Sequence, residues 1–196
     1  MNNAILERLN IPDRHFDVSM EQIPSKCGHK GHIESFFKSG RFELSISNGY
    51  GLYLWGDYST GKSALLSIVL LRGIVSGLWG LYVTAEDLPK YYIEKTSFDD
   101  ACLFKDRIEN VPILAIDEVL LHHGDTYKDT VIESVFRKRL SKKLSTFFSS
   151  NINPDKLKKE YPAFYSAMKE SVLPIKVSGY DFREVKKLNL KEEILG

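Results

Sequence analysis

The segment 56–63, GDYSTGKS, constrains the fold of this 196-residue chain more than any other feature. It matches the pattern G-x-x-x-x-G-K-[ST], and it lies between an apolar run at 51–55 and a long apolar segment at 63–76. That context predicts a buried strand, a glycine-rich turn and a helix, the arrangement in which backbone N–H groups wrap a phosphate. The helix adds its positive amino end to the same anion. We therefore expect a phosphate-binding loop on an α/β scaffold.

Each position of this loop has a chemical part in binding ATP with Mg²⁺. We expect Lys62 to reach the β- and γ-phosphates and the Ser63 hydroxyl to bind Mg²⁺. Glycine permits unusual backbone angles and a close approach of the phosphate. The predicted nucleotide-binding residues are Gly56, Asp57, Tyr58, Ser59, Thr60, Gly61, Lys62, Ser63 and Ala64.

Polar groups also follow two apolar runs further along the chain. The run 111–116 (VPILAI) ends in Asp117 and Glu118, and the run 145–150 (STFFSS) ends in Asn151. Ligands of open α/β sheets bind at the carboxyl ends of the strands, so these side chains should meet the phosphate loop there. We expect Asp117 to hold the Mg²⁺ shell and Glu118 to polarise an attacking water. Asn151 would bind the γ-phosphate and that water.

Strands and helices alternate at the spacing of βαβ units, which build a parallel sheet. The apolar runs are continuous, as expected for strands covered on both faces. Strands are predicted at 51–55, 80–84, 111–116, 145–150 and 175–177, and helices within 1–14 and at 32–38, 63–76, 85–94 and 130–143. The predicted fold class is α/β, a three-layer sandwich with a mostly parallel sheet flanked by helices.

Composition excludes several other classes of protein. The chain is 43% hydrophobic and 27% charged, as in ordinary globular proteins. Its apolar runs are far shorter than the roughly 20 residues of a membrane span, and its amino terminus has no apolar signal-peptide region. Two cysteines are too few for a disulfide scaffold and favour a reducing compartment. We expect a cytoplasmic protein.

Charge is unevenly distributed along a chain whose formal net charge is +1. Residues 138–196 carry 13 basic and 7 acidic side chains, whereas residues 1–137 carry 14 and 19. Such a positive region could attract single-stranded DNA, or it could be a solvated lysine-rich surface. The expected DNA contacts lie at the end of a predicted helix, beside the strand that leads to Asn151: Lys138, Arg139, Lys142 and Lys143.

Four stretches, GLYLWGDYSTGKSALLSIVLL, GLYVTAEDL, VPILAIDEV and FRKRLSKKLSTFFSSNIN, resemble in this order the AAA+ ATPases of the DnaC/IstB type. The motif IPDRHF at 11–16 also resembles the segment that precedes the ATPase core in that family, and the resemblance covers 11–183. It implies that Lys62 and Ser63 are the Walker A residues, that Asp117 and Glu118 are the Walker B residues, and that Asn151 is a sensor. Catalytic roles then belong to Lys62, Glu118 and Asn151.

The same resemblance implies how the chain is organised and what it works with. It divides the chain into an N-terminal helical segment (1–50), an ATPase core (51–183) and a C-terminal tail (184–196), with little or no separate lid domain. The implied partners are a replicative helicase and single-stranded DNA, and the chain would form homo-oligomers on binding ATP or DNA in a bacterial or phage setting. Because few residues precede Gly56, docking would use 1–14, another surface or a different partner.

One segment departs from the family pattern. Family members carry an arginine that completes a neighbour's ATP site, but the corresponding segment 161–170 (YPAFYSAMKE) has none. Ala167 and Lys169 stand closest to that position, and a lysine lacks the bidentate fork of arginine. The finger would then come from Arg137, Arg139 or another chain, or hydrolysis would be weak.

These observations favour an ATP-hydrolysing accessory protein of DNA replication that loads or remodels a replicative helicase on single-stranded DNA. A transposon-type ATPase that delivers a transposase to DNA is the first alternative. A nucleotide-binding interaction module with weak turnover is the second; the missing arginine favours it, and the Asp117–Glu118 pair opposes it. A small-molecule kinase is disfavoured, because the loop lies far from the amino terminus and no arginine-rich lid is visible.

Overall fold

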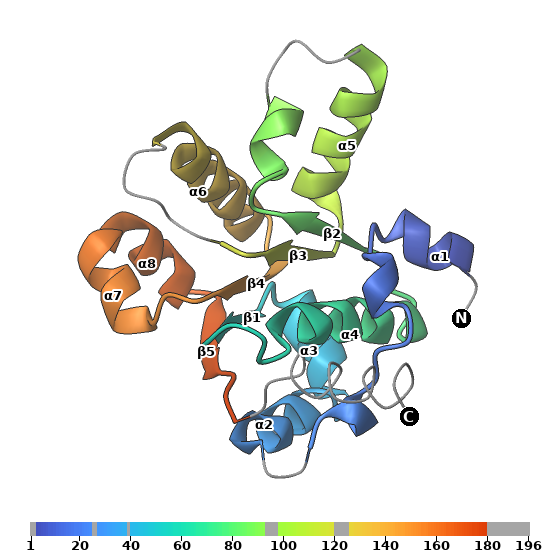
Figure 1. Cartoon of the computed structure of the whole chain (residues 1–196). Helices are drawn as coiled ribbons and strands as arrows, with labels where there is room; N and C mark the ends of the chain where they lie inside the picture. Colours follow the sequence, from blue (N-terminus) through green and yellow to red (C-terminus); the bar gives the residue numbers. More distant parts are fainter. Residues whose placement is uncertain (1–2, 25–26, 39, 93–97, 120–125, 180–196) are drawn as a thin grey trace, which may run out of the picture.

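The computed structural model describes residues 3–24, 27–38, 40–92, 98–119 and 126–179 (Figure 1). At its centre lies a sheet of five strands: β1 (Gly51–Trp55), β2 (Gly80–Thr84), β3 (Ile113–Asp117), β4 (Ser145–Ser150) and β5 (Val172–Lys176). Their spatial order is β2-β3-β4-β1-β5, and each neighbouring pair is parallel. The predicted parallel sheet is confirmed, with different bounds at β3 and β5.

Helices cover both faces of this sheet, as Figure 1 shows. One face carries α2 (Gly28–Phe36), α3 (Arg41–Ser47) and α4 (Lys62–Val75). The other carries α5 (Phe98–Asn110), α6 (Thr126–Ser141), α7 (Pro154–Glu160) and α8 (Pro162–Lys169). The predicted three-layer sandwich is therefore confirmed. None of the helices in the described ranges is long and apolar enough to cross a membrane.

Each face of the sheet has its own hydrophobic core. Leu54 and Phe147 belong to the core under α4, whereas Tyr53 and Phe148 belong to the core on the opposite face. Consecutive residues of a strand point to opposite faces, so neighbouring aromatic residues divide between the two cores. All four side chains are buried, and burying a large apolar side chain contributes about 1.5–3 kcal/mol. This two-sided burial explains why the strands are continuous apolar runs.

The N-terminal segment covers the outer edge of β2. Its helix, α1 (Asn3–Arg8), ends before the Ile11-Pro12 step, where proline disfavours helix in the residue before it, and Asn10 takes a positive φ of 57°. The carbonyl oxygen of Leu9 accepts a hydrogen bond from the Tyr82 backbone at 2.7 Å. The Asn10 side chain donates to the Tyr82 carbonyl oxygen at 2.9 Å. These contacts fix the N-terminal segment against the sheet.

Several helix predictions are wrong or displaced. In place of a helix at 85–94, the structure has a short 3₁₀-helix at Leu88–Tyr92, and α5 was not predicted. The helix expected at 32–38 is α2, which begins at Gly28 and ends at Phe36. Gly40 is the N-cap of α3, which was not predicted, and has a φ of 80°.

Candidate nucleotide-binding site

The loop between β1 and α4 has the backbone expected of a phosphate loop. Gly56 and Gly61 have φ values of 148° and 90°, in the region that favours glycine. A Cβ atom on Gly56 would lie 2.1 Å from the carbonyl oxygen of Val177, so a larger residue would clash there. The Thr60 hydroxyl donates to the Asp57 carbonyl oxygen at 2.9 Å and stiffens the turn.

Lys62 begins α4, and its ammonium lies within the loop. Its Nζ donates to the carbonyl oxygens of Gly56 at 2.9 Å and Asp57 at 2.6 Å, and the residue is buried. Since the amino end of α4 also points at the loop, two sources of positive potential meet there. An anion held by the loop N–H groups would be neutralised from both sides.

Asp117 ends β3 and is almost fully buried, with 1% of its surface exposed. Its Oδ1 accepts a hydrogen bond from the Ser149 hydroxyl, and its Oδ2 accepts one from the Tyr82 hydroxyl. Burial, together with the charge of Asp117, raises the pKa of Tyr82, so the phenol remains a protonated donor at neutral pH. The carboxylate is therefore held by hydroxyl donors from the two strands that flank β3.

Glu118 leaves the strand in a different direction from Asp117. It has a φ of 55°, and its backbone N–H donates to the Ser149 hydroxyl at 2.9 Å. A left-handed conformation costs a non-glycine residue roughly 1–2 kcal/mol, and the Ser149 contacts hold it in place. The turn leaves the Glu118 side chain exposed at the cavity, whereas Asp117 lies behind Ser149.

Asn151 directly follows β4 and lies beside the turn after β3. The neighbouring Ser150 hydroxyl donates to the Val119 carbonyl oxygen at 2.5 Å and accepts from the Ile152 backbone at 3.1 Å. These bonds join the turns that carry Asn151 and Glu118. The two polar side chains therefore lie at the same edge of the sheet, as the strand order requires.

A cavity of about 680 Å³ brings these groups together. Its walls include the loop and first helical turn (58–65), Glu118 and Asn151. The structure thus gathers most of the predicted site residues around one space, with Asp117 one layer behind. The opposite wall, which the sequence did not predict, comes from the N-terminal segment and α2: Arg14, His15, Asp17, Val18, Ser19, Gln22, Ile23 and His29.

His15 connects this N-terminal wall to α4. Its Nδ1 lies 3.1 Å from the Ser67 hydroxyl, which donates to the Ser63 carbonyl oxygen at 3.2 Å. Burial and the nearby Arg14 lower the pKa of His15, so the ring is neutral at pH 7. His15 lies within the IPDRHF motif, but nothing local in that motif indicates that it packs behind the phosphate loop.

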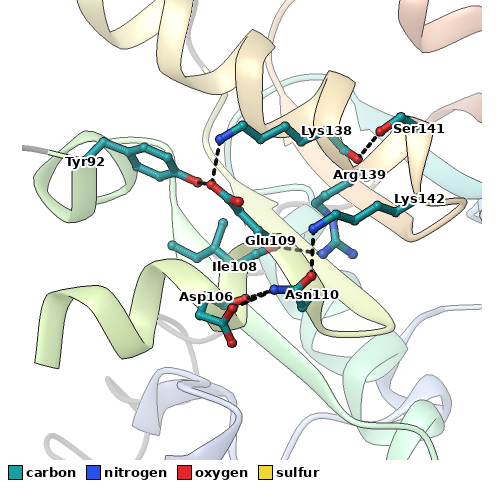
Figure 2. Close-up of polar contacts among 9 residues, drawn as sticks. All are labelled: Tyr92, Asp106, Ile108, Glu109, Asn110, Lys138, Arg139, Ser141 and Lys142. Carbon is teal, nitrogen blue, oxygen red and sulfur yellow. Dashed lines mark hydrogen bonds and ion pairs between the residues drawn. The ribbon is translucent and has the colours of Figure 1, made fainter. Parts of the chain in front are cut away.

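Arg139 is placed where it cannot contact DNA, which corrects its prediction as a nucleic-acid residue. Its side chain has no exposed surface, because it is enclosed between α5, α6 and the sheet (Figure 2). The guanidinium donates to four oxygens at 2.7–3.0 Å: the carbonyls of Ile108, Val111 and Ser145 and the Thr146 hydroxyl. Burial lowers its pKa to about 9. Arg139 is a structural residue, and it cannot serve as an arginine finger either.

The neighbouring lysines form contacts within the fold, as Figure 2 shows. Lys138 Nζ lies 2.9 Å from Glu109 Oε1, which also accepts from the Tyr92 hydroxyl at 3.0 Å. Lys142 Nζ donates to Asn110 Oδ1 at 2.7 Å. These bonds join α6 and the turn after it to α5, and they join α5 to the 3₁₀-helix at Leu88–Tyr92.

Lys142 and Lys143 lie far from the nucleotide cavity. They immediately precede β4, whereas Asn151 follows it, so the length of the strand, about 20 Å, separates them. As predicted, these lysines adjoin the strand that leads to Asn151, but they lie at the opposite end of that strand from the amide. Both side chains are nevertheless exposed.

The phosphate loop, Glu118 and Asn151 meet at the carboxyl edge of this parallel sheet, with Asp117 one layer behind, and the chain has the AAA+ P-loop fold. No family model matches the chain.

Two curated relatives are replicative helicase loaders. DnaI of Bacillus subtilis (strain 168) is 29% identical over 177 residues, which cover 86% of this chain and 55% of that protein. DnaC of Buchnera aphidicola subsp. Baizongia pistaciae (strain Bp) is 27% identical over 154 residues, covering 76% and 61%. The chain thus spans little more than half the length of these relatives. The resemblance to the DnaC type is confirmed.

Solved structures show the same fold. The crystal structure of DnaI has a TM-score of 0.69 at 20% identity and covers 87% of this chain and 93% of that one. The DnaC helicase loader has a TM-score of 0.71 at 17% identity, with 85% and 100% covered. The initiator DnaA bound to AMPPCP and single-stranded DNA has a TM-score of 0.67 at 16% identity, with 93% and 56% covered. The predicted fold class is confirmed.

Proposed function

We propose that this chain is an ATP-dependent accessory protein of DNA replication that loads or remodels a replicative helicase on single-stranded DNA. The observation that carries this proposal is the convergence of the phosphate loop, Glu118 and Asn151 on one cavity, in a chain similar to two replicative helicase loaders. Helicase loading is the stated function of those relatives, and it is transferred here as a proposal.

ATP would bind with its phosphates in the loop 56–63 and its nucleoside toward the N-terminal wall. Mg²⁺ fits the donor chemistry of the Ser63 hydroxyl and the Asp117 carboxylate, because this ion prefers oxygen ligands. Bound there, it would neutralise charge on the β- and γ-phosphates. Lys62 would add its ammonium to the same phosphates.

Hydrolysis would depend on two side chains that lie at the cavity. Glu118 is exposed there and would act as the general base for an attacking water. Asn151 would donate its amide to the γ-phosphate and orient that water. In such a site ATP orders the contacts around the γ-phosphate, and hydrolysis releases them. A partner protein could therefore distinguish the ATP-bound state from the hydrolysed state.

Full turnover would require an arginine finger, and because α8 has no arginine in any copy of the chain, the finger would come from Arg137 of a neighbouring copy or from a different protein. Within α8 the side chains nearest the expected finger position are Ala167, which is buried, and Lys169, which is exposed. Arg137 is bonded to Glu133 at 2.7 Å and to the Ala163 carbonyl oxygen at 3.1 Å. We therefore favour slow hydrolysis by the isolated chain and assembly into homo-oligomers on ATP or DNA. The same observation favours an interaction module with weak turnover as the second candidate.

The remaining assignments follow from this proposal. The segment 1–50 would carry α1 and the N-terminal wall, 51–183 would form the ATPase core, and 184–196 would be a tail. Exposed Lys142 and Lys143 would contribute a DNA contact that is remote from the nucleotide. The protein would work in the cytoplasm of a bacterium or of a phage-infected cell.

A helicase-loading assay tests the proposal. The replicative helicase of the host is mixed with single-stranded DNA coated by single-strand binding protein, and unwinding is measured with and without this chain and ATP. We expect unwinding to depend on both. Unwinding that is unchanged by the chain, together with normal ATP binding, would favour the interaction module.

A further inference from the structure

A tyrosine on β2 contacts one of the two residues to which we assign Mg²⁺. The Tyr82 hydroxyl donates to Asp117 Oδ2. The strand register explains the geometry. Thr84 pairs with Asp117, and Tyr82 lies two residues earlier on the same face of the sheet, so its ring reaches along the sheet to the carboxylate.

Tyr82 is itself held firmly by the N-terminal segment. Its backbone N–H donates to Leu9 and its carbonyl oxygen accepts from Asn10, at 2.7 and 2.9 Å. The ring meets the ring of His15 edge-on, with centroids 6.4 Å apart, and 2% of the residue is exposed. A side chain fixed at the backbone, the ring and the hydroxyl has little freedom to reorient.

We propose that Tyr82 is a positioning residue of the metal site, which orients the Asp117 carboxylate toward the ion and is locked in place by the segment 9–15. This inference rests on the proposed function, since it assumes that Ser63 and Asp117 bind Mg²⁺. Asp117 Oδ2 accepts from the phenol and Oδ1 from the Ser149 hydroxyl, and each oxygen keeps a second lone pair for the metal shell. Partners of this kind orient metal-binding carboxylates, and losing one typically weakens metal affinity by about 10- to 100-fold.

The test compares the wild type with Tyr82→Phe, which removes only the hydroxyl oxygen. Tyr92→Phe is a matched control, because its hydroxyl also donates to a carboxylate, that of Glu109, but on the face opposite the cavity. Mn²⁺ binding is measured by electron paramagnetic resonance in the presence of a non-hydrolysable ATP analogue. Binding of a fluorescent ATP analogue is measured separately in EDTA.

We expect Tyr82→Phe to bind Mn²⁺ about tenfold more weakly than the wild type, and Tyr92→Phe to match the wild type. Nucleotide affinity in EDTA should be equal in all three proteins, since Lys62 and the loop are intact. Equal nucleotide affinity would also show that the variants are folded, because a merely structural effect would lower the affinity for the nucleotide as well as for Mn²⁺.

Two results would overturn the inference, and they differ in what they leave standing. If Tyr82→Phe binds Mn²⁺ as tightly as the wild type, or more tightly, Tyr82 does not position Asp117, and the proposed function stands. If the wild type binds neither the nucleotide analogue nor Mn²⁺ with it, the proposed function and the inference fail together.

Discussion

Replacing Arg139 with alanine tests how the sheet and the α5–α6 layer are held together. The change removes a guanidinium that donates to three buried carbonyl oxygens, those of Ile108, Val111 and Ser145, and to the Thr146 hydroxyl. A buried polar group that loses its partner costs about 1–3 kcal/mol, and a hydrogen bond to a charged group contributes about 1.5–3 kcal/mol. Water entering the space would satisfy some of these oxygens. We expect the free energy of unfolding to fall by about 3–5 kcal/mol.

Urea denaturation followed by circular dichroism measures this loss. For a chain of this size about 1 kcal/mol corresponds to about 2–4 °C in Tm, so Arg139→Ala should melt roughly 6–20 °C lower. Lys142→Ala, in the turn directly after the same helix, is the matched control: it loses an exposed contact with Asn110 and should stay within about 0.5 kcal/mol of the wild type. An Arg139→Ala protein within about 1 kcal/mol of the wild type would refute the reasoning, and so would an equal loss in the control.

Three further predictions concern hydrolysis, DNA binding and pH. Glu118→Gln should retain ATP but hydrolyse it about 10²–10⁴-fold more slowly in a phosphate-release assay, and unchanged turnover would exclude Glu118 as the base. Reversing Lys142 and Lys143 to Glu should weaken single-stranded DNA binding and flatten its salt dependence in fluorescence anisotropy; equal affinity at every salt concentration would remove DNA from this surface. Burial lowers the pKa of His15 and His29 below 6.5, the value in the unfolded chain. At pH values between the folded and the unfolded pKa, the unfolded chain therefore binds more protons than the folded protein. Unfolding free energy should therefore fall as pH drops from 7.5 to 5.5, and urea denaturation that shows a rise would contradict this.

The sheet and the phosphate loop could be predicted because their signals are local. Strands covered on both faces are continuous apolar runs, and GDYSTGKS lies where strand, turn and helix must follow one another. Asp117, Glu118 and Asn151 could be placed at one edge because parallel strands present their carboxyl ends together.

The helices between strands were harder to predict, because local polar bonds compete with helical periodicity. The Thr84 hydroxyl and the Asp87 carboxylate lie 2.6 Å apart and form a turn, which explains why the described part of the helix predicted at 85–94, residues 85–92, is a turn and a short 3₁₀-helix. Short α3 has too few residues for a clear apolar period.

Tertiary contacts account for the residues that the sequence did not indicate. Tyr82 and Ser149 reach Asp117 only through the strand register, and His15 reaches α4 from a segment 52 residues earlier. The prediction for Arg139 failed because a basic residue in a lysine-rich stretch normally points to solvent. Here the backbone carbonyls of Ile108, Val111 and Ser145 enclose the side chain instead.

The central claim is that the loop 56–63 binds the phosphates of ATP through Lys62. Isothermal titration calorimetry of Mg-ATP with the wild type and with Lys62→Ala tests it most directly, and a thermal melt of each protein verifies that the variant is folded. We expect one binding site per chain in the wild type and a loss of tight binding in the folded variant, because the substitution removes the ammonium at the loop and leaves the backbone intact. Equal affinity of the two proteins for Mg-ATP would contradict the account.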